Sequence, residues 1–376
     1  MEKTVEHYRR NMRPTYLEVN LAQLQKNIEA IRAQVAPAKV MPMVKANAYG
    51  HGVDGVAPFI EPYVDYIGVA LVEEGIYLRE LGIRKPILVA GATLREQVPL
   101  FAEYDLTLTG SSWELLDVAE EVSRSTGSPI KTHLKIDTGM ERVGVREYEA
   151  EAFILRTSAY RHIAIEGIYT HLANSESADR SYSMMQIERF QEVLSLYEKH
   201  SLPVPALRHV CNSGGILNLP DSYFDMVRPG VLCYGVYPGD EVDRIIEVKP
   251  ALTWRSCVAY SKRTQPGRPI GYGSLWQAER ETGIVTIPCG YADGYFRRMT
   301  NRAQVLIGQK KYPQVGRICM DQFMVNVGDD EIQVGDEVIL LGEGIAAEDL
   351  AQWMGTNEYE VMTNISARIP RVYVNE

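Results

Sequence analysis

The sequence lacks the features of an exported, membrane-bound or nucleic-acid-binding protein. None of its apolar runs approaches the about 20 residues that span a bilayer, and its first residues, MEKTVEHYRRNMRP, hold no apolar signal core. The net charge of −10 leaves no basic surplus to offset phosphate repulsion. The five cysteines are odd in number and have no CxxC spacing, so reduced thiols are expected rather than a disulfide framework. We therefore expect a cytoplasmic protein with no nucleic-acid or membrane partner, and we predict no metal site.

The length and composition suit a globular chain with a large core. With 376 residues, 45% hydrophobic and 23% charged, the chain is long enough for two domains or for one large barrel with an appendage. From about residue 20 to 230, short β-rich runs alternate with amphipathic stretches. The apolar positions after Asn20 recur at helical spacing and predict a helix that this asparagine caps: Leu21, Leu24, Ile28, Ile31 and Val35.

Eight short apolar runs follow this helix and predict strands. They are Val40–Val44, Tyr66–Ala70, Ile87–Ala90, Leu106–Thr109, Lys131–Ile136, Ile163–Ile168, Leu207–Cys211 and Asp225–Arg228. Helical patterns fill most of the gaps, as at Val72–Leu81, Ser112–Arg124 and Ser183–His200. Eight β-then-α units are the number found in a (β/α)8 TIM barrel. We therefore predict an N-terminal α/β barrel, although Pro42 interrupts its first strand.

Beyond about residue 240 the pattern changes to strands joined by Gly, Pro and Asp turns. ALTWRSCVAYSKRTQPG, TGIVTIPCGY, AQVLIGQKKYPQVG and DEVILLGEG are of this type, and one helix is predicted around Ala346–Met354. We place the boundary near residues 237–244, so that residues 1–240 form the barrel and residues 241–376 form a mostly-β domain. The first strand, near residues 14–19, is a candidate to pair with this second domain.

The active site of such a barrel lies at the carboxyl ends of its strands. Lys45 and Tyr49 follow the first strand, and the later strands are followed by KIDTGMERVG, YTHLANSE, CNSGG and VRPGVLCYG. Each piece has an ordinary explanation. A lysine at a strand end is usually solvated, CNSGG suits a helix cap, and a histidine such as His171 is more often a satisfied core residue than a catalyst.

In combination, these residues indicate a phosphate site and a reactive lysine. The last two loops of such barrels commonly bind phosphate through backbone N–H groups. Ser213 would add a hydroxyl, and Gly230 with Val231 would add backbone amides. Arg228, at the base of the barrel, needs an anionic or acceptor partner. A phosphorylated cofactor joined to Lys45 as a Schiff base fits this set, and pyridoxal phosphate is the leading candidate. A sugar-phosphate aldolase would also use a lysine and a phosphate site, but it has no evident need of the β domain.

The ordered motifs resemble the alanine racemase family, pyridoxal-phosphate enzymes with a barrel and a β domain. VKANAYGHG, KIDTGMERVG, YTHLANSE, CNSGG, VRPGVLCYG, GYGS, GYADGY and GRICMDQ occur in the family's order and at about its spacing, from residue 44 to 322. TYLEVNL near the start and ISARIPRVY near the end extend the likeness over almost the whole chain. The lysine motif alone is fairly specific, and the ordered set is very specific.

The resemblance implies catalytic roles for two residues. Lys45 would carry the cofactor and, once freed by substrate, would act as one acid/base. Tyr272 would be the other, acting from the opposite face. In the family this tyrosine comes from the partner subunit, so a homodimer with shared active sites is implied. Arg228 would hydrogen-bond the pyridine nitrogen of the cofactor, and His171 would support Arg228.

The resemblance also implies roles in binding. Arg142 would contact the phenolic oxygen of the cofactor and the substrate carboxylate. Lys135 would hold Arg142, and in the family this lysine is often carbamylated. Met320 resembles a substrate-side backbone contact. The remaining matches are phosphate contacts, at Tyr49, Ser213, Gly230 and Val231, and residues that line the entrance, at Tyr291 and Arg317.

The partner of the pyridine nitrogen favours racemisation over other chemistry. A carboxylate there would keep the nitrogen protonated and would favour decarboxylation or transamination. An arginine cannot accept that proton, so the ring stays neutral and return of the proton to Cα dominates. The resemblance therefore implies an alanine racemase that interconverts L-alanine and D-alanine and supplies D-alanine for peptidoglycan.

Ala367 departs from the family pattern. In ISARIPR it stands where well-known members carry a tyrosine that touches the phosphate and narrows the entrance. Either the entrance is wider, which would favour serine, lysine or broad specificity, or Tyr373 compensates for the change. A third hypothesis is a non-catalytic pyridoxal-phosphate carrier. The β domain with Tyr272 and Met320 argues against it.

Overall fold

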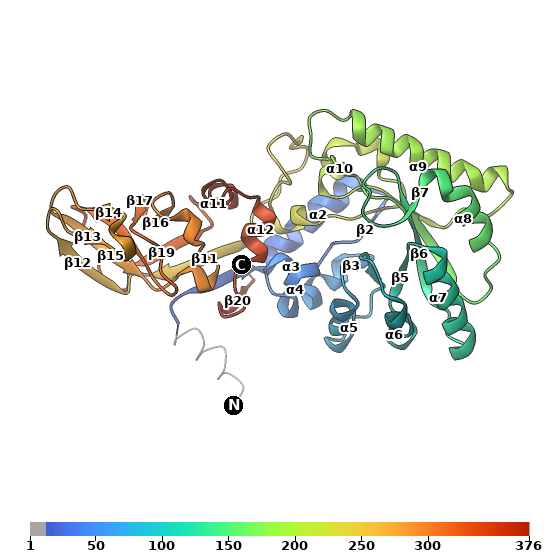
Figure 1. The fold of residues 1–376 in the computed structure, drawn as a ribbon, viewed down its shortest axis with the longest axis horizontal. Helices are drawn as coiled ribbons and strands as arrows, with labels where there is room; N and C mark the ends of the chain where they lie inside the picture. The colour runs from blue at the N-terminus through green and yellow to red at the C-terminus, as the bar shows by residue number, and fades with distance from the viewer. Residues whose placement is uncertain (1–12, 376) are drawn as a thin grey trace. The chain divides into compact units, whose positions relative to one another are not determined.

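The computed structural model describes residues 13–375, which form two compact units (Figure 1). The barrel unit consists of Leu24–Ala48 and Val53–Lys249. The C-terminal unit consists of the described residues up to Gln23, the short piece Tyr49–Gly52 and the chain from Pro250 onward. The C-terminal unit is therefore assembled from segments that are far apart in the sequence, whereas only residues 49–52 interrupt the barrel unit.

The barrel unit contains a parallel strand at each of the eight predicted positions. Six of them form one sheet in the order β3-β4-β5-β6-β8-β9, with the short β7 (Val145–Arg146) beside β6. The strands are β2 (Lys39–Val40), β3 (Ile67–Val69), β4 (Ile87–Val89), β5 (Thr107–Gly110), β6 (Lys131–Asp137), β8 (Ala164–Tyr169), β9 (Leu207–His209) and β10 (Met226–Val227).

Backbone hydrogen bonds join the first and last strands to this sheet. Met41 N donates to Val227 O at 2.9 Å, which links β2 to β10. Arg228 N donates to Cys211 O at 2.8 Å beyond the ends of β10 and β9. Gly68, in β3, donates to the carbonyl of Pro42. The parallel sheet thus curls back on itself, and the predicted α/β barrel with a mostly-β second domain is confirmed.

Pro42 shortens the first strand relative to the prediction. Hydrogen bonding typical of a strand covers only β2, whereas the sequence pattern predicted Val40–Val44. Proline has no N–H to donate to a neighbouring strand. Pairing resumes at Met43, which bridges Gly68. The chain therefore reaches Lys45 as an extended but irregular segment.

Amphipathic helices lie outside the barrel strands (Figure 1). Asn20 caps α2 (Leu21–Val35) as predicted, because its Oδ1 accepts from Gln23 N at 2.9 Å. Ser112 caps α7 (Trp113–Thr126) in the same way, by accepting from Leu115 N. The other helices of this unit are α4 (Val53–Ile60), α5 (Val72–Glu80), α6 (Val98–Glu103), α7 (Trp113–Thr126), α8 (Ala150–Thr157), α9 (Ser181–Lys199) and α10 (Ser213–Asn218).

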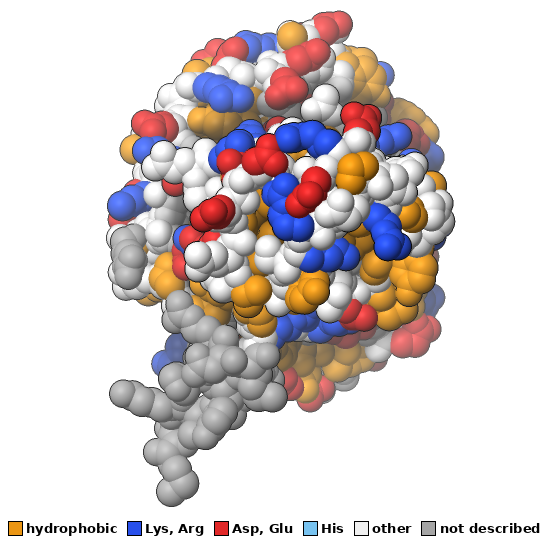
Figure 2. Space-filling view, turned by 90° about the vertical axis from the view of Figure 1, so that its left-hand side faces the viewer, with side chains coloured by type: hydrophobic (Ala, Val, Ile, Leu, Met, Phe, Trp, Pro, Cys, Tyr) orange, Lys and Arg blue, Asp and Glu red, His pale blue; other side chains and the backbone are white. Residues whose placement is uncertain are grey.

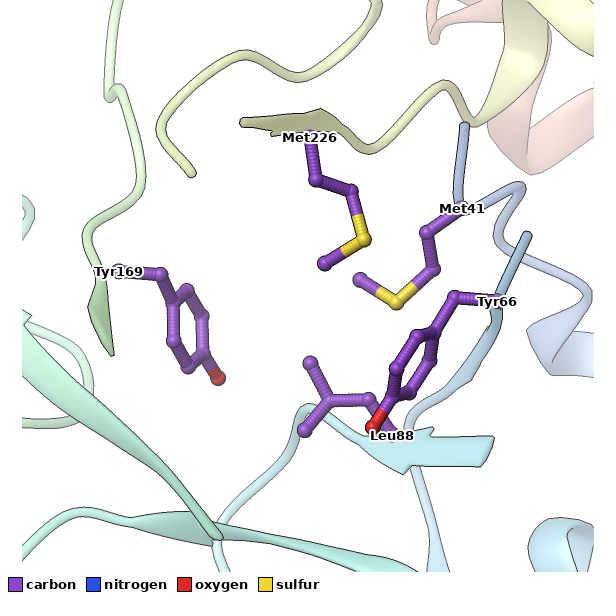
Figure 3. Close-up of a cluster of buried hydrophobic side chains, with 5 residues drawn as sticks. All are labelled: Met41, Tyr66, Leu88, Tyr169 and Met226. Carbon is purple, nitrogen blue, oxygen red and sulfur yellow. The ribbon is translucent and has the colours of Figure 1, made fainter. Parts of the chain in front are cut away.

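The interior of the barrel is filled by large side chains that point toward one another (Figure 3). They come from five different strand regions: Met41, Tyr66, Leu88, Tyr169 and Met226. Complete burial of one such apolar side chain contributes about 1.5–3 kcal/mol. The two tyrosines bond their hydroxyls to threonines of β5, at 2.7 Å for Tyr66 and 2.8 Å for Tyr169. The packed interior forms a floor beneath the strand ends.

The C-terminal unit is built on one large, mostly antiparallel sheet, in the order β12-β15-β18-β17-β16-β19-β11-β1-β20. Its strand β1 (Tyr16–Asn20) pairs antiparallel with β11 and parallel with β20. A separate antiparallel pair of strands is formed by β13 (Pro269–Ile270) and β14 (Trp276–Gln277). The remaining strands are β11 (Leu252–Cys257), β12 (Tyr260–Thr264), β15 (Thr282–Ile287), β16 (Gln304–Ile307), β17 (Lys310–Val315), β18 (Phe323–Gly328), β19 (Glu337–Leu341) and β20 (Arg371–Val374).

The C-terminal unit also has a helix that the sequence pattern did not predict. The expected helix is present as α11 (Ala347–Met354), and α12 (Glu358–Thr363) follows it. Asn357 caps α12 by accepting from Glu360 N at 3.0 Å. The six residues of α12 are too few to show a helical period, so the Asn357 cap was the only local signal.

The surface carries charges of both signs. On the face drawn in Figure 2, Lys and Arg side chains lie beside Asp and Glu. Ion pairs such as Arg280–Asp329 and Lys310–Asp330 are examples from the C-terminal unit. Within residues 13–375 we find no helix that is both long and apolar enough to cross a bilayer.

Candidate active site

Lys45 begins a short turn of left-handed backbone, α3 (Lys45–Tyr49). Ala46, Asn47 and Ala48 have φ values of 52°, 56° and 53°, and Tyr49 follows with 52°. Left-handed backbone costs a non-glycine residue about 1–2 kcal/mol of conformational free energy. Four such residues in succession require support from the surrounding structure.

Side chains of the barrel unit supply part of this support. Glu74 of α5 accepts from Ala46 N through Oε1 at 2.7 Å. Asn47 accepts from Val53 N through Oδ1 at 2.8 Å, so its side chain caps the start of α4. The turn is therefore tied to the first residues of two helices.

The glycines after the turn allow a close approach of backbone in the C-terminal unit. Gly50 and Gly52 have φ values of 84° and 95°. A Cβ on Gly50 would lie 2.1 Å from the carbonyl oxygen of Met362. A Cβ on Gly52 would lie 2.2 Å from the hydroxyl of Tyr373, which donates to Gly52 O at 3.2 Å. Both positions therefore require glycine.

The amine of Lys45 is half-buried at the end of the first strand region. Desolvation, followed by the positive charge of Arg142, lowers the pKa of Lys45 from its usual value. The carboxylate of Glu74 opposes this shift. An amine with a lowered pKa is a better nucleophile near neutral pH.

Arg228 is buried at the base of the site and is surrounded by neutral acceptors. Its Nη2 donates to Thr170 O at 2.7 Å and to Val210 O at 2.9 Å, and its Nη1 lies 2.7 Å from His209 Nδ1. The guanidinium carbon also lies 5.1 Å from the centre of the Tyr169 ring. Burial lowers the pKa of Arg228 to about 10, which leaves the guanidinium charged at neutral pH.

Histidines surround this guanidinium. His171 Nδ1 lies 3.2 Å from Arg228 Nη2. His209 is buried, and its ring stacks on Tyr169 with centroids 4.6 Å apart. Desolvation, then the charge of Arg228, lowers the pKa of both histidines well below the usual value. Both rings are therefore neutral at physiological pH.

Lys135 is a buried amine on β6 without a carboxylate hydrogen bond in the described chain. Its Nζ donates to Ile136 O at 3.2 Å and lies 4.9 Å from the centre of the Tyr169 ring. Burial, followed by the charge of Arg228, lowers the pKa of Lys135 to about 7. The nearby carboxylate of Asp137 is occupied by backbone N–H groups of the next turn, including that of Arg142 at 3.1 Å.

Ser213 connects the loops that follow β9 and β10. Its hydroxyl accepts from Gly230 N at 2.9 Å and from Leu232 N at 3.4 Å. Asn212 caps α10 by accepting from Gly215 N at 3.0 Å. The structure thus brings Ser213 and Gly230 together, with Val231 next to Gly230 at the start of a short 3-10 helix.

Tyr272 lies on a tight turn of the C-terminal unit. Its side chain is 70% exposed, and the flanking Gly271 and Gly273 have φ values of 72° and 73°. A Cβ on Gly273 would lie 3.6 Å from the guanidinium carbon of Arg317. The structure therefore places Tyr272 and Arg317 close together, with the tyrosine presented to solvent.

Tyr291 and Met320 lie on two loops of the same unit that are joined by backbone hydrogen bonds. Tyr291 N donates to Cys319 O and Ala292 N to Met320 O, both at 3.0 Å. The side chains of Tyr291 and Met320 are exposed. The predicted site residues are thus brought together in two sets. One set lies on the barrel unit, and the other, which includes Tyr49, lies on the C-terminal unit.

Comparison with known proteins assigns the chain to a family. Residues 19–238 match the model of the alanine racemase N-terminal domain, and residues 251–373 match that of the C-terminal domain. The chain belongs to the alanine racemase family. An alanine racemase of Carboxydothermus hydrogenoformans is 42% identical over 370 residues, which cover 96% of this chain and 100% of that protein.

Solved structures of family members have the same fold. An alanine racemase of Clostridium difficile is 38% identical and superposes with a TM-score of 0.92, covering 96% of both chains. One from Bartonella henselae, described with covalently bound pyridoxal phosphate, is 28% identical with a TM-score of 0.88 and covers 96% of this chain and 99% of that chain. The resemblance inferred from the ordered motifs is confirmed.

Several residues that shape the site were not singled out in the sequence. His209 contacts Arg228 directly, and His133 lies behind it at 2.8 Å. Glu74 contacts the turn that follows Lys45. Glu74 falls in the first turn of the helix predicted at Val72–Leu81, where acidic residues are common. No local pattern distinguishes the two histidines from ordinary strand residues.

Ala367, which departs from the family pattern, is exposed in the C-terminal unit. The preceding residue, Ser366, donates its N–H to Asp293 O at 3.0 Å, two residues after Tyr291. The hydroxyl of Tyr373 donates a hydrogen bond to the carbonyl of Gly52.

Proposed function

We propose that this protein is an alanine racemase that interconverts L-alanine and D-alanine with pyridoxal phosphate and supplies D-alanine for peptidoglycan. The observation that carries the proposal is Arg228, a buried arginine whose acceptors are neutral carbonyls and histidines. An arginine donates to a pyridine nitrogen and cannot protonate it as a carboxylic acid would. This favours racemisation over transamination.

The residues of the barrel unit fit such a cofactor. Lys45, with its lowered pKa, would hold the aldehyde carbon covalently. Ser213, Gly230 and Val231 would bind the phosphate, and the resemblance adds Tyr49, which belongs to the C-terminal unit. Arg228, supported by His171, would donate to the ring nitrogen. When bound, pyridoxal phosphate supplies an electron sink that acidifies the Cα–H bond of the substrate.

Proton transfer is assigned to two residues of this sequence. Lys45 moves the proton on one face of the substrate Cα, and Tyr272 moves it on the other. Tyr272 is exposed on its own unit, which suits a residue that completes the active site of a second subunit. We therefore propose a homodimer with shared sites, in which residues 241–376 supply Tyr272 to the partner and residues 1–240 bind the cofactor.

Substrate binding is assigned to the remaining charged residues. Arg142 would bind the substrate carboxylate. Lys135, a buried amine with a pKa of about 7, would hold Arg142, and as a carbamate it would do so with a negative charge. The backbone at Met320 would contact the substrate, and Tyr291 and Arg317 would line the entrance. We place the enzyme in the cytoplasm, with small amino acids as its substrates.

The alternative that one observation favours is a racemase of serine, lysine or broad specificity. Ala367 is small and exposed, and a wider entrance would admit longer side chains. The non-catalytic carrier hypothesis has no such support, because the match to the family's C-terminal domain covers residues 251–373.

The test has two parts. Purified protein is incubated with pyridoxal phosphate and reduced with borohydride, and peptide mass analysis then locates the pyridoxyl group, which is expected on Lys45. Racemisation of L-alanine, L-serine and L-lysine is then compared by chiral chromatography, with alanine expected to have the highest kcat/KM. A pyridoxyl group at another lysine would remove the assignment of Lys45. A higher kcat/KM for serine or lysine would replace alanine as the substrate.

A further inference from the structure

The carboxylate of Glu74 accepts hydrogen bonds from two separate segments of the chain. Its Oε2 accepts from Ala70 N at 2.8 Å and from Leu71 N at 3.1 Å, which closes the start of α5. Its Oε1 accepts from Ala46 N at 2.7 Å. One carboxylate therefore joins the loop after β3 to the residue that follows Lys45. Hydrogen bonds to a charged acceptor are roughly twice as strong as those between neutral groups.

The bond to Ala46 lies at the start of the left-handed turn. Ala46 is the first of four successive non-glycine residues with positive φ, and its N–H belongs to the peptide group that joins it to Lys45. Alanine has no intrinsic preference for this conformation. The direction in which Lys45 leaves the backbone depends on this peptide, so the group that holds the peptide also sets the position of the amine.

We propose that Glu74 is a positioning residue for Lys45, which it holds by fastening the strained turn through the N–H of Ala46. The proposal rests on the function proposed above for Lys45. The negative charge of Glu74 has a second effect. It raises the pKa of Lys45, whereas desolvation and the charge of Arg142 lower it. Glu74 thus combines a steric and an electrostatic influence on one amine.

The competing explanation is that Glu74 only caps α5. A carboxylate at the third helical position is a common cap and stabilises a helix without any role in catalysis. The two explanations make different predictions for a variant in which the cap is restored by another residue. Leu71 offers this opportunity, because it is the N-cap of α5, is exposed and has the extended backbone that a capping serine adopts.

The variants are therefore Glu74→Ala, the double variant Glu74→Ala with Leu71→Ser, and the control Glu73→Ala. Glu73 is exposed in the same first turn of α5, so its removal subtracts the same charge near the helix start. The protein is used as the full chain with its cofactor. The midpoint of thermal unfolding measures the stability that the helix cap provides. Hydrogen exchange at residue resolution measures how well the Ala46 amide is protected.

The proposal predicts that Leu71→Ser recovers thermal stability in the Glu74→Ala background but not the protection of Ala46. The exchange rate of the Ala46 amide stays raised by about tenfold or more, as expected for loss of a bond to a charged acceptor. Glu73→Ala leaves this rate unchanged. If the double variant recovers both stability and Ala46 protection, Glu74 is only a cap and the proposal is overturned.

A kinetic measurement separates positioning from general damage. Lys45 moves the proton on only one face, so its displacement should raise the Cα-deuterium isotope effect for the enantiomer whose proton Lys45 removes. For the other enantiomer the effect should fall, because return of the proton by Lys45 becomes the slow step. An equal change for both enantiomers in the double variant would overturn the positioning role. Absence of racemisation in the unaltered protein would instead overturn the proposed function, while the exchange result would still decide whether Glu74 fastens the turn.

Discussion

Arg228 Nη1 lies 2.7 Å from His209 Nδ1, and this contact determines where the protons of two histidines lie. A guanidinium only donates, so Nδ1 of His209 is an acceptor and its proton is on Nε2. His209 Nε2 lies 2.8 Å from His133 Nδ1 and donates to it. The proton of His133 is therefore on Nε2, an atom for which no hydrogen-bond partner exists among the described residues.

This series of hydrogen bonds makes the buried guanidinium of Arg228 depend on His209 as an acceptor. Replacement of His209 by leucine removes an acceptor from a buried guanidinium and leaves a donor unpaired. We expect the free energy of unfolding to fall by about 1–3 kcal/mol, measured by urea denaturation. The matched control is His162→Leu, which removes an exposed histidine paired with Glu120 and should lower stability by less than about 1 kcal/mol. Equal losses in the two variants would contradict the dependence.

Acid should destabilise the protein partly through His133. Burial lowers the pKa of His133 from 6.5 to about 3. In the unfolded chain this ring is protonated below its ordinary pKa, whereas in the folded chain it stays neutral. The unfolded state therefore binds more protons in this window, and the stability that His133 provides is full above pH 6.5 and is lost as the pH falls toward about 3.

The measurement compares the protein with its His133→Leu variant. Urea denaturation at several pH values should give a shallower fall in stability for the variant below pH 6.5, with a difference in slope of up to about 1.4 kcal/mol per pH unit. Contributions from other groups cancel in the comparison. Parallel curves would show that His133 titrates normally in the folded protein.

Lys135 should produce a second window at higher pH, in which stability again rises with pH. Burial lowers its pKa from 10.5 to about 7, so between these values the unfolded chain binds a proton that the folded chain does not. The stability of the protein relative to a Lys135→Met variant should therefore rise between pH 7 and 10.5. Added bicarbonate should stabilise the protein and not the variant if the amine forms a carbamate. An equal response would rule out a carbamate at Lys135.

Tyr272 should be required for proton transfer on one face only. Tyr272→Phe removes the hydroxyl and should lower racemisation by about a hundredfold to ten-thousandfold. Exchange of the Cα proton with deuterated water should persist for the enantiomer whose proton Lys45 removes. The control is Tyr260→Phe, another exposed tyrosine of the same unit. Racemisation undiminished in Tyr272→Phe would show that the second base is another residue.

Ala367 should influence which amino acids enter the site. Ala367→Tyr places a ring at an exposed position of the C-terminal unit and should lower kcat/KM for serine and lysine more than for alanine. Ala367→Ser, which changes the volume little, serves as the control. The same factor for all three amino acids would show that residue 367 does not select substrates.

Much of the fold could be read from local sequence, and the site residues were predicted from their places after the strands together with the family resemblance. The eight strand positions follow from short apolar runs, because burial on both faces of a parallel sheet requires them. The caps at Asn20 and Ser112 mark helix starts, because their side chains satisfy N–H groups that a helix leaves free. The order of the motifs was enough to predict the family.

The tertiary structure decided what depends on contacts between distant residues. The left-handed turn after Lys45 is not preferred by its own residues, and its Ala46 N–H is bound by Glu74 of helix α5. The lowered pKa of Lys135 and the neutral acceptors around Arg228 arise from burial inside the barrel. The local sequence indicates which backbone conformation each residue prefers. The turn, the lowered pKa and the acceptors around Arg228 instead depend on desolvation and hydrogen bonds, which exist only in the closed barrel.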